Sequence, residues 1–298
     1  MFPIIPAASA AVSGNQEGIF GYGVNGGYQS LTNLVSNAGV VASDVTGVGT
    51  ARKKLAACEY GEDKGIFGYG NTGGYVSMTN LVSNVGVVAT DVTGVGTARG
   101  EIAACGYGED KGIFGFGRNG GATAVTNLVS NAGVIATDVT GVGTARSRPA
   151  ACEYGGDKGI FGFGNSDSGN ESVTNLVSNA GVVATDVTGV GTARYGPAAC
   201  EYGGDKGIFG YGNDGSNYVS MTNLVSNAGV VATDVTGVGT ARDNLAACEY
   251  GGNKGIFGYG YTTGNVSMTN LVSSGGVVAT DVTGVGTARH YIAACSFN

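Results

Sequence analysis

The sequence predicts an all-β fold, a six-bladed β-propeller with four strands in each blade. Three observations lead to this prediction. One unit of 47 or 48 residues occurs six times, each copy holds four short strand-like segments, and 58 of the 298 residues are glycine. A β-solenoid is the alternative, but its rungs are usually much shorter than this unit.

The repeat is visible as the string GIFG, which opens each unit, and as GVVATDVTGVGTAR, which follows later in it. Those fourteen residues are identical in four units, whereas the first unit has Ser43 for Thr and the third has Ile135 for Val. Neither a linker nor a change of composition separates the units, so residues 15–298 are predicted to form one domain. The units begin at Gly18, Gly65, Gly112, Gly159, Gly207 and Gly255.

Four segments of each unit have strand character. In the second unit they are AACEY (56–60), GIFGYG (65–70), TNLVS (79–83) and GVVATDV (86–92). They are small and apolar, aromatic and glycine-rich, or β-branched, and turn-forming strings such as YGEDKG separate them. No 11-residue window has the 3.6-residue period of a helix.

The two ends of the chain predict how the ring closes. The first unit lacks an AAC segment, because Ser9, Ala10 and Ala11 occupy the aligned positions, whereas Cys295 lies in a sixth AAC segment at the C-terminus. We therefore expect the C-terminal strand to complete the first blade, which brings Asn298 close to residues 14–17 and covers exposed sheet edges. Residues 1–14 then form an apolar N-terminal arm, which we expect to dock onto other subunits of an assembly.

Crowding near the axis of such a ring explains much of the glycine content. Inner strands converge there, so small residues such as Ala57, Gly65 and Gly68 are expected, and glycine also permits tight turns. Phe67 and Tyr69, with their counterparts, are expected to fill the space between sheets.

The order of these segments resembles that of kelch repeats. TAR and AAC precede the aromatic-glycine strand GIFGYG and then a strand pair, although Gly-Tyr-Gly or Gly-Phe-Gly replaces the kelch Gly-Gly doublet and tryptophan is absent. The combination of GVVATDVTGVGTAR with GGDKGIFGYG also resembles repeat tracts of virion and tail-fibre-associated proteins of bacteriophages. The first resemblance implies a propeller, and the second implies a virion component of the fibre or adhesin type.

Two sets of equivalent residues could carry chemistry, and both have a simpler interpretation. A ring of aspartates could bind cations, but hydrogen bonds that lock neighbouring blades, with an arginine, are the favoured interpretation. The six cysteines, 47 or 48 residues apart, fit no zinc pattern, and we expect buried free thiols. The aspartates are Asp44, Asp91, Asp138, Asp186, Asp234 and Asp281.

The sequence argues against several other classes of function. His290 is the only histidine, and no counterpart occurs in the other units, so no catalytic triad can be assembled and we expect no enzyme, cofactor or metal. A net charge of −7 argues against nucleic acid as a partner. The apolar runs are too short for a helix that spans a membrane. The expected location is a virion, with an extracellular or cytoplasmic protein as the alternative.

The segments in which the units differ predict a binding face. They follow the second strand (24–29 and equivalents) and the TAR string (53–55 and equivalents), and in a four-stranded antiparallel blade both lie at the same end. Tyrosine among Asn, Ser and Gly is typical of adaptable recognition surfaces. We expect this face to contact a host-surface glycan or protein; a lectin-like or kelch-like interaction module of a cell is the alternative. The candidate residues are Tyr28, Tyr75, Arg118, Asn165, Tyr195, Tyr218, Asp243, Tyr261, His290 and Tyr291.

Overall fold

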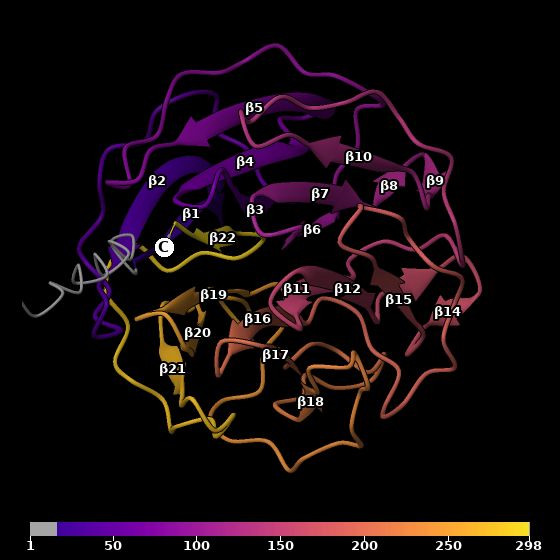
Figure 1. Ribbon diagram of the computed structural model, residues 1–298. Coiled ribbons are helices and arrows are strands. Elements are labelled where there is room, and N and C mark those ends of the chain that lie inside the picture. Colours follow the sequence, from indigo (N-terminus) through magenta and orange to yellow (C-terminus); the bar gives the residue numbers. More distant parts are fainter. Residues whose placement is uncertain (1–16, 298) are drawn as a thin grey trace, which may run out of the picture.

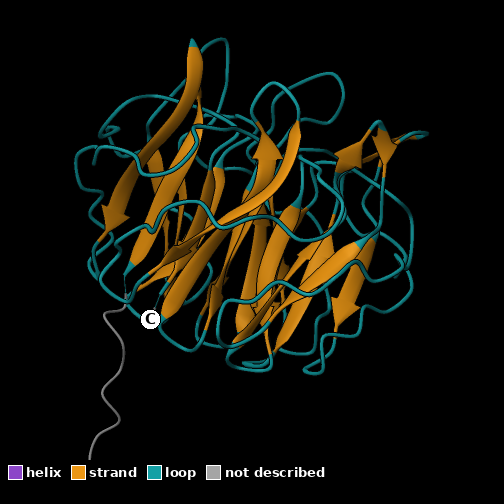
Figure 2. Ribbon diagram, turned by 90° about the horizontal axis from the view of Figure 1, so that it is seen from above, coloured by secondary structure: helices purple, strands orange, loops and turns teal. Residues whose placement is uncertain are grey.

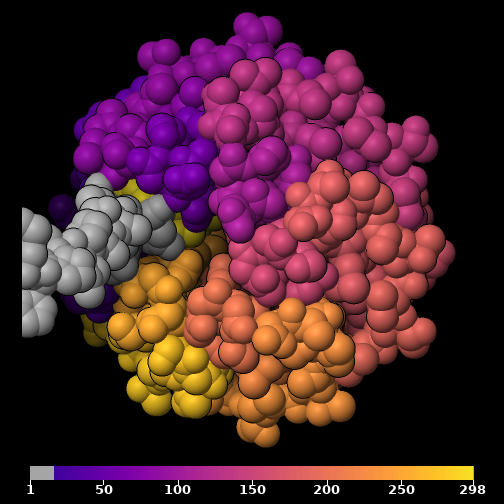
Figure 3. All heavy atoms as spheres, in the orientation of Figure 1, coloured from indigo at the N-terminus to yellow at the C-terminus, as the bar shows by residue number. Residues whose placement is uncertain are grey.

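The computed structural model describes residues 17–297, which contain 22 strands and no helix. The all-β prediction is therefore confirmed. Each of the six units has a three-stranded antiparallel sheet, and two units add a small two-stranded hairpin. Figure 1 shows the sheets arranged about a central axis in sequence order, and the same order appears as coloured sectors in Figure 3.

Each sheet has an inner, a middle and an outer strand. The inner strands are β3 (Ala56–Tyr60), β6 (Ala103–Tyr107), β11 (Ala150–Tyr154), β16 (Ala198–Tyr202), β19 (Ala246–Tyr250) and β22 (Ala293–Ser296). The middle strands are β4 (Lys64–Asn71), β7 (Lys111–Gly115), β12 (Lys158–Gly162), β17 (Lys206–Gly210), β20 (Lys254–Gly258) and β1 (Gly18–Asn25). The outer strands are β5 (Tyr75–Val82), β10 (Thr126–Val129), β15 (Thr174–Val177), β18 (Thr222–Val225), β21 (Thr269–Val272) and β2 (Gly27–Val35). The hairpins are β8 (Arg118–Asn119) with β9 (Gly121–Ala122), and β13 (Asn165–Ser166) with β14 (Gly169–Asn170). Figure 2 shows the strands running between the two ends of the molecule, with loops at both.

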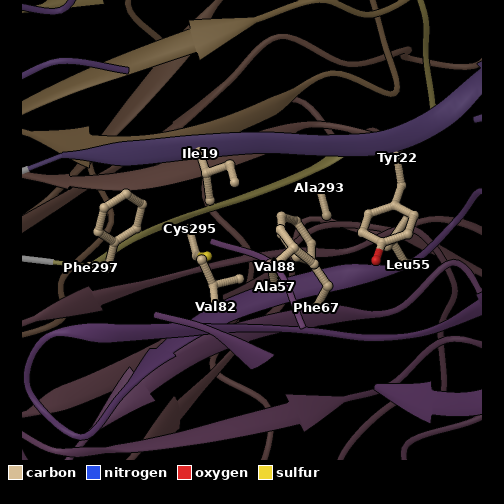
Figure 4. Close-up of a cluster of buried hydrophobic side chains, with 10 residues drawn as sticks. All are labelled: Ile19, Tyr22, Leu55, Ala57, Phe67, Val82, Val88, Ala293, Cys295 and Phe297. Carbon is tan, nitrogen blue, oxygen red and sulfur yellow. The ribbon is translucent and has the colours of Figure 1, made fainter. Parts of the chain in front are cut away.

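The core lies between neighbouring sheets. Alternation along β3 places Cys58 and Tyr60 on one face, in a cluster with β4 and the next unit, and Ala57 on the other face. Figure 4 shows the second cluster, in which Phe67 and Ala57 of the second unit pack against side chains of β1 and β22, among them Ile19. Each interface between units is thus a small apolar core of its own.

The prediction of a fourth strand in each unit is wrong. Residues 41–45 of the first unit form only isolated bridges, Val35 with Val41 and Thr32 with Val45, and the other units repeat this pattern. These two bridges differ in register by one residue, and between them Nδ2 of Asn33 donates to the carbonyl oxygen of Ala42 at 3.0 Å. That carbonyl would otherwise belong to a regular ladder, so the segment is attached to the sheet without extending it.

Both ends of the chain contribute to the first sheet. The strand β22 pairs with β1, with Cys295 opposite Ile19, so the strand order is β2-β1-β22. The backbone N–H of Phe297 donates to the carbonyl of Glu17 at 3.1 Å. This pairing agrees with the alignment of the AAC segments. The expected positions of Asn298 and of the arm, residues 1–14, lie outside the described residues.

An aromatic residue with left-handed backbone geometry lies near or just after the end of the middle strand in each unit. Tyr69 has φ of 63°, and the register shifts by one residue between Gly68 and Gly70. Such a conformation costs about 1–3 kcal/mol for a residue other than glycine. The bulge turns the Tyr69 ring into the interface, where it lies 5.2 Å from the ring of Phe114 in the next unit. Packing of the ring offsets the local strain.

Close packing between sheets explains glycines that the sequence assigns only to the crowded axis. A Cβ atom added to Gly65 would lie 2.5 Å from the sulfur of Cys295, in the preceding unit. One added to Gly68 would lie 2.7 Å from Cζ of Phe114, in the following unit. The two glycines of GIFG therefore leave room for a cysteine side chain of one neighbouring unit and a phenylalanine side chain of the other.

Candidate binding face

A buried arginine network joins each unit to the next. Arg99 is fully buried and donates from Nε to the carbonyl of Phe116 at 3.0 Å and from Nη2 to Oδ1 of Asn127 at 2.7 Å. Its guanidinium lies 4.4 Å from the centroid of the Tyr69 ring. The arginine that ends one unit is thus bound by backbone and side-chain groups of the following unit.

The equivalent aspartates complete this network. Asp138 accepts hydrogen bonds from Nδ2 of Asn127 at 2.9 Å and from the hydroxyl of Thr97, in the preceding unit, at 2.5 Å. Partial burial alone would raise the pKa of Asp138, but these hydrogen bonds outweigh it and lower the pKa. The interpretation of the aspartates as interlocking residues, and not as a cation ring, agrees with these contacts. The described residues contain no cluster of three or more His, Cys, Asp or Glu arranged to hold a metal ion.

The six cysteines are free and buried, as expected. They belong to the inner strands, which also enclose a narrow axial cavity of about 70 Å³. Burial raises the pKa of Cys105 well above its usual range. A thiol with a raised pKa is a poor nucleophile, so this set of residues serves packing.

Four glutamates follow the cysteines and line the same cavity. They are Glu59, Glu153, Glu201 and Glu249, called here the axial glutamates; Gly106 and Ser296 occupy the two remaining equivalent positions. Burial raises the pKa of Glu59 to about 8, although the hydroxyl of Ser296 donates to its carboxylate at 3.1 Å. Burial and the other three carboxylates also raise the pKa of Glu153.

At the other end of the axis, six residues form a closed cycle of backbone hydrogen bonds. Each is the middle residue of a variable triplet, and each N–H donates to the carbonyl of its counterpart in the preceding unit at 2.8–3.1 Å. The N–H of Lys54 donates to the carbonyl of Tyr291, at the other end of the sequence, and this bond closes the cycle. We call these residues the mouth: Lys54, Glu101, Arg148, Gly196, Asn244 and Tyr291. All six have positive φ, between 51° and 63°.

Charged side chains of the mouth form a compact ion cluster. Glu101 is 6% exposed, and its Oε1 atom lies 2.6 Å from Nζ of Lys54 and 3.1 Å from Nη2 of Arg148. Burial alone would raise the pKa of Glu101, but Arg148 and Lys54 outweigh this effect and lower it. One carboxylate oxygen of Glu101 is therefore shared by two cations, and these three side chains together carry a net positive charge.

Beside this cluster lies a pocket of about 420 Å³, which we call the polar pocket. It collects four of the candidate residues, and Ser147, which is 2% exposed, contributes to its wall. The guanidinium of Arg148 lies 5.1 Å from the centroid of the Tyr195 ring. The lining residues are Lys54, Tyr75, Glu101, Arg118, Ser147, Arg148, Asn165 and Tyr195.

Four other candidates form a row of aromatic side chains. The ring of Tyr261 lies 6.2 Å from that of Tyr218 and 5.0 Å from that of His290, which in turn lies 4.7 Å from the ring of Tyr291. Burial, together with Lys53 and Lys54, lowers the pKa of His290 to about 4. His290 is therefore neutral at physiological pH; its ring packs between Tyr261 and Tyr291, and its Nδ1 atom lies 2.6 Å from Oδ1 of Asn265.

The two remaining candidates take different positions. Tyr28 is 37% exposed. Nζ of Lys53 lies 5.4 Å from the centroid of the Tyr28 ring and 5.9 Å from that of the Tyr291 ring, so Lys53 lies between the two tyrosines. Asp243 is 4% exposed and its Oδ1 atom has no hydrogen-bond partner. Burial raises the pKa of Asp243 to about 6, an effect that Arg148 opposes.

The two variable sets do meet at one end of the molecule. Bridges join Lys53 to Asn71 and Val24 to His290, and so connect the triplet of one unit with the loop of the next. Sequence reasoning missed Lys54, Glu101 and Arg148, the charged members of the mouth. Their signal was present, since these triplet positions differ in every unit, but charge alone does not show that three units place them together.

Comparisons with known proteins leave the family open. The chain matches no protein-family model and no curated protein sequence. Among the described residues, no helix is long and apolar enough to cross a membrane.

Proposed function

We propose that this chain is a non-enzymatic recognition protein whose variable face binds a glycan or protein on a host surface. The observation that carries the proposal is the polar pocket: its lining comes from the positions at which the units differ, whereas the arginine network that holds the units together uses the positions at which they agree. Binding residues on loops above a rigid scaffold are a common arrangement.

We propose a six-bladed β-propeller, with three strands in each blade, as the architecture that displays this face. Three features support closure into a ring. The mouth forms an unbroken cycle of hydrogen bonds, β22 pairs with β1, and Arg289 of the last unit donates to the carbonyl of Tyr22 in the first at 2.8 Å. A closed ring hides the edges of the inner strands.

The proposed location is a bacteriophage virion, where the protein would act as a fibre or adhesin-type component. The resemblance of the repeat to virion and tail-fibre tracts supports this location, and residues 1–14 are the proposed contact with other subunits. A lectin-like or kelch-like module of a cell would use the same pocket. Co-purification separates the two: a virion component sediments with particles, whereas a cellular module does not.

Binding itself is tested with substitutions that the repeat already tolerates. Tyr195→Ser installs the residue that Ser147 provides at the equivalent position, and it removes an aromatic wall of the polar pocket. Binding to intact host cells and to an array of glycans would be measured for the parent, for this variant and for a control. We expect loss of binding in this variant alone. The matched control, Glu62→Gly at the opposite end of the molecule, reproduces Gly156 of another unit and should bind as the parent does. Equal binding by all three proteins would refute the proposal.

A further inference from the structure

We propose that the polar pocket takes a sugar residue that carries a carboxylate. This inference rests on the proposed recognition function and names the class of ligand for the same site. It follows from the charge of the pocket, from the donors left free in it and from its aromatic walls.

The charge of the pocket is opposite to that of the protein. Three cationic side chains, Lys54, Arg118 and Arg148, line it, and Glu101 is the only carboxylate among the lining residues, so the lining itself has an excess of two positive charges. Two carboxylates outside the lining, Asp167 beside Arg118 and Asp243 near Arg148, offset part of this excess. The whole chain carries −7. Low-dielectric walls concentrate the field of such a local excess, so an anion is drawn to this part of the face.

Two guanidinium groups retain donors that the protein does not use. Arg148 is bonded to Glu101 through Nη2 alone, its side chain is 28% exposed, and among the described residues its Nη1 atom has no hydrogen bond. Arg118 has one acidic neighbour, Asp167, at 3.7 Å; that carboxylate is 66% exposed, and an exposed pair of this length contributes little. Planar guanidinium groups match the two oxygens of a carboxylate.

The remaining lining residues suit a sugar ring better than a small inorganic anion. Tyr75 and Tyr195 present aromatic walls. Nδ2 of Asn165 donates to Asn170, which leaves the amide oxygen of Asn165 to accept from a sugar hydroxyl. A pocket of about 420 Å³ is within the range of small-molecule sites and far larger than a phosphate ion requires. An acidic sugar uses both the charge and the aromatic surface.

The repeat supplies substitutions that test the charge without disturbing the fold. Arg118→Asn installs the residue found at the equivalent positions 71, 165 and 213, and Arg148→Asn installs that of Asn244. Lys111→Gln, at the opposite end of the molecule, is the control that removes the same charge elsewhere. Unchanged melting temperatures establish that each variant is folded.

Binding would be titrated calorimetrically with glucuronic acid, N-acetylneuraminic acid, glucose and inorganic phosphate. We expect binding of at least one acidic sugar, with no binding of glucose or phosphate at the same concentration. Either arginine substitution should weaken it roughly tenfold or more, as the loss of a charge-assisted hydrogen bond predicts, and Lys111→Gln should leave it unchanged. Added salt should weaken binding by the parent protein.

Each other outcome contradicts the inference in a recognisable way. If glucose and glucuronic acid bind equally well and Arg118→Asn changes neither affinity, the pocket does not select an acidic sugar, although the proposed recognition function stands. If inorganic phosphate binds as tightly as the acidic sugars, the pocket is a simple anion site and the sugar assignment is overturned. Binding of host cells that depends on Tyr195, without binding of any of the four probes, also overturns this inference while the proposed function stands.

Discussion

The axial glutamates make the stability of this fold depend on pH. Burial raises the pKa of Glu59 from 4.5 to about 8 and that of Glu201 to about 7. In the unfolded chain both carboxyls titrate near 4.5, so between these values the folded protein holds more protons than the unfolded one. Stability is therefore fully present below pH 4.5 and decreases as the pH rises toward 8.

The size of the effect follows from the shift at Glu59. A rise from 4.5 to about 8 corresponds to at most about 5 kcal/mol, at 1.36 kcal/mol for each pKa unit. The carboxylate faces the axial cavity, and water that enters this cavity reduces the penalty, so we expect about 1–3 kcal/mol from this residue. Glu59→Gln removes the charge and keeps an acceptor for the hydroxyl of Ser296.

Urea denaturation at pH 5, 7 and 9 measures this difference. The variant Glu59→Gln should differ least from the parent at pH 5, where the folded carboxyl is protonated and little of its stabilisation has been lost, and should be more stable by about 1–3 kcal/mol at pH 9. Glu62→Gln removes an equal charge from an exposed turn and should show no such dependence. A gain that is the same at pH 5 and pH 9, or a parent protein of constant stability across this range, would refute the reasoning.

Three further predictions concern the contacts between units. Arg99→Lys should reduce the free energy of unfolding by about 2–4 kcal/mol, and Arg146→Lys by about 1 kcal/mol less, because Nη2 of Arg146 has no hydrogen-bond partner; equal losses in urea denaturation would contradict this. Gly68→Ala should cost about 1–3 kcal/mol because its Cβ would collide with a phenylalanine ring, whereas Gly74→Ala, with open space around it, should be neutral in the same assay. Truncation before β22 should abolish cooperative unfolding by leaving an inner edge of β1 unpaired, and a peptide of that sequence should restore it; a truncated chain that melts like the parent would argue against the role of this strand.

Much of the fold could be predicted because the chain repeats itself. Six aligned copies make each strand segment visible six times, and the AAC segment missing from the first unit indicates the pairing of β22 with β1. The fourth strand was beyond this reasoning. GVVATDV has the composition of a strand, but only the structure shows that Asn33 takes the carbonyl of Ala42.

The candidate site was predictable at the level of the face and not of the pocket. Differences between units locate the variable segments, and Tyr75, Arg118, Asn165 and Tyr195 do line one pocket. The ion cluster was not foreseen because its members lie one unit apart in sequence. They meet because a cycle of backbone hydrogen bonds joins the middle residues of the triplets, each in a left-handed conformation such as φ of 57° at Glu101, and no residue type indicates that conformation in advance.

The hydrogen-bonded cycle of the mouth has a consequence for how such a protein can change. Its bonds use backbone atoms alone, so lysine, glutamate, arginine, glycine, asparagine and tyrosine all occupy the same station without altering it. The side chain at this position can therefore change in one unit while the other five units keep theirs. A seventh copy is different, because it would have to enter between two of these residues, break the hydrogen bond that joins them and form two new ones. Side chains at this end of the molecule can therefore change one at a time, whereas a change in the number of copies alters the hydrogen-bonded cycle itself.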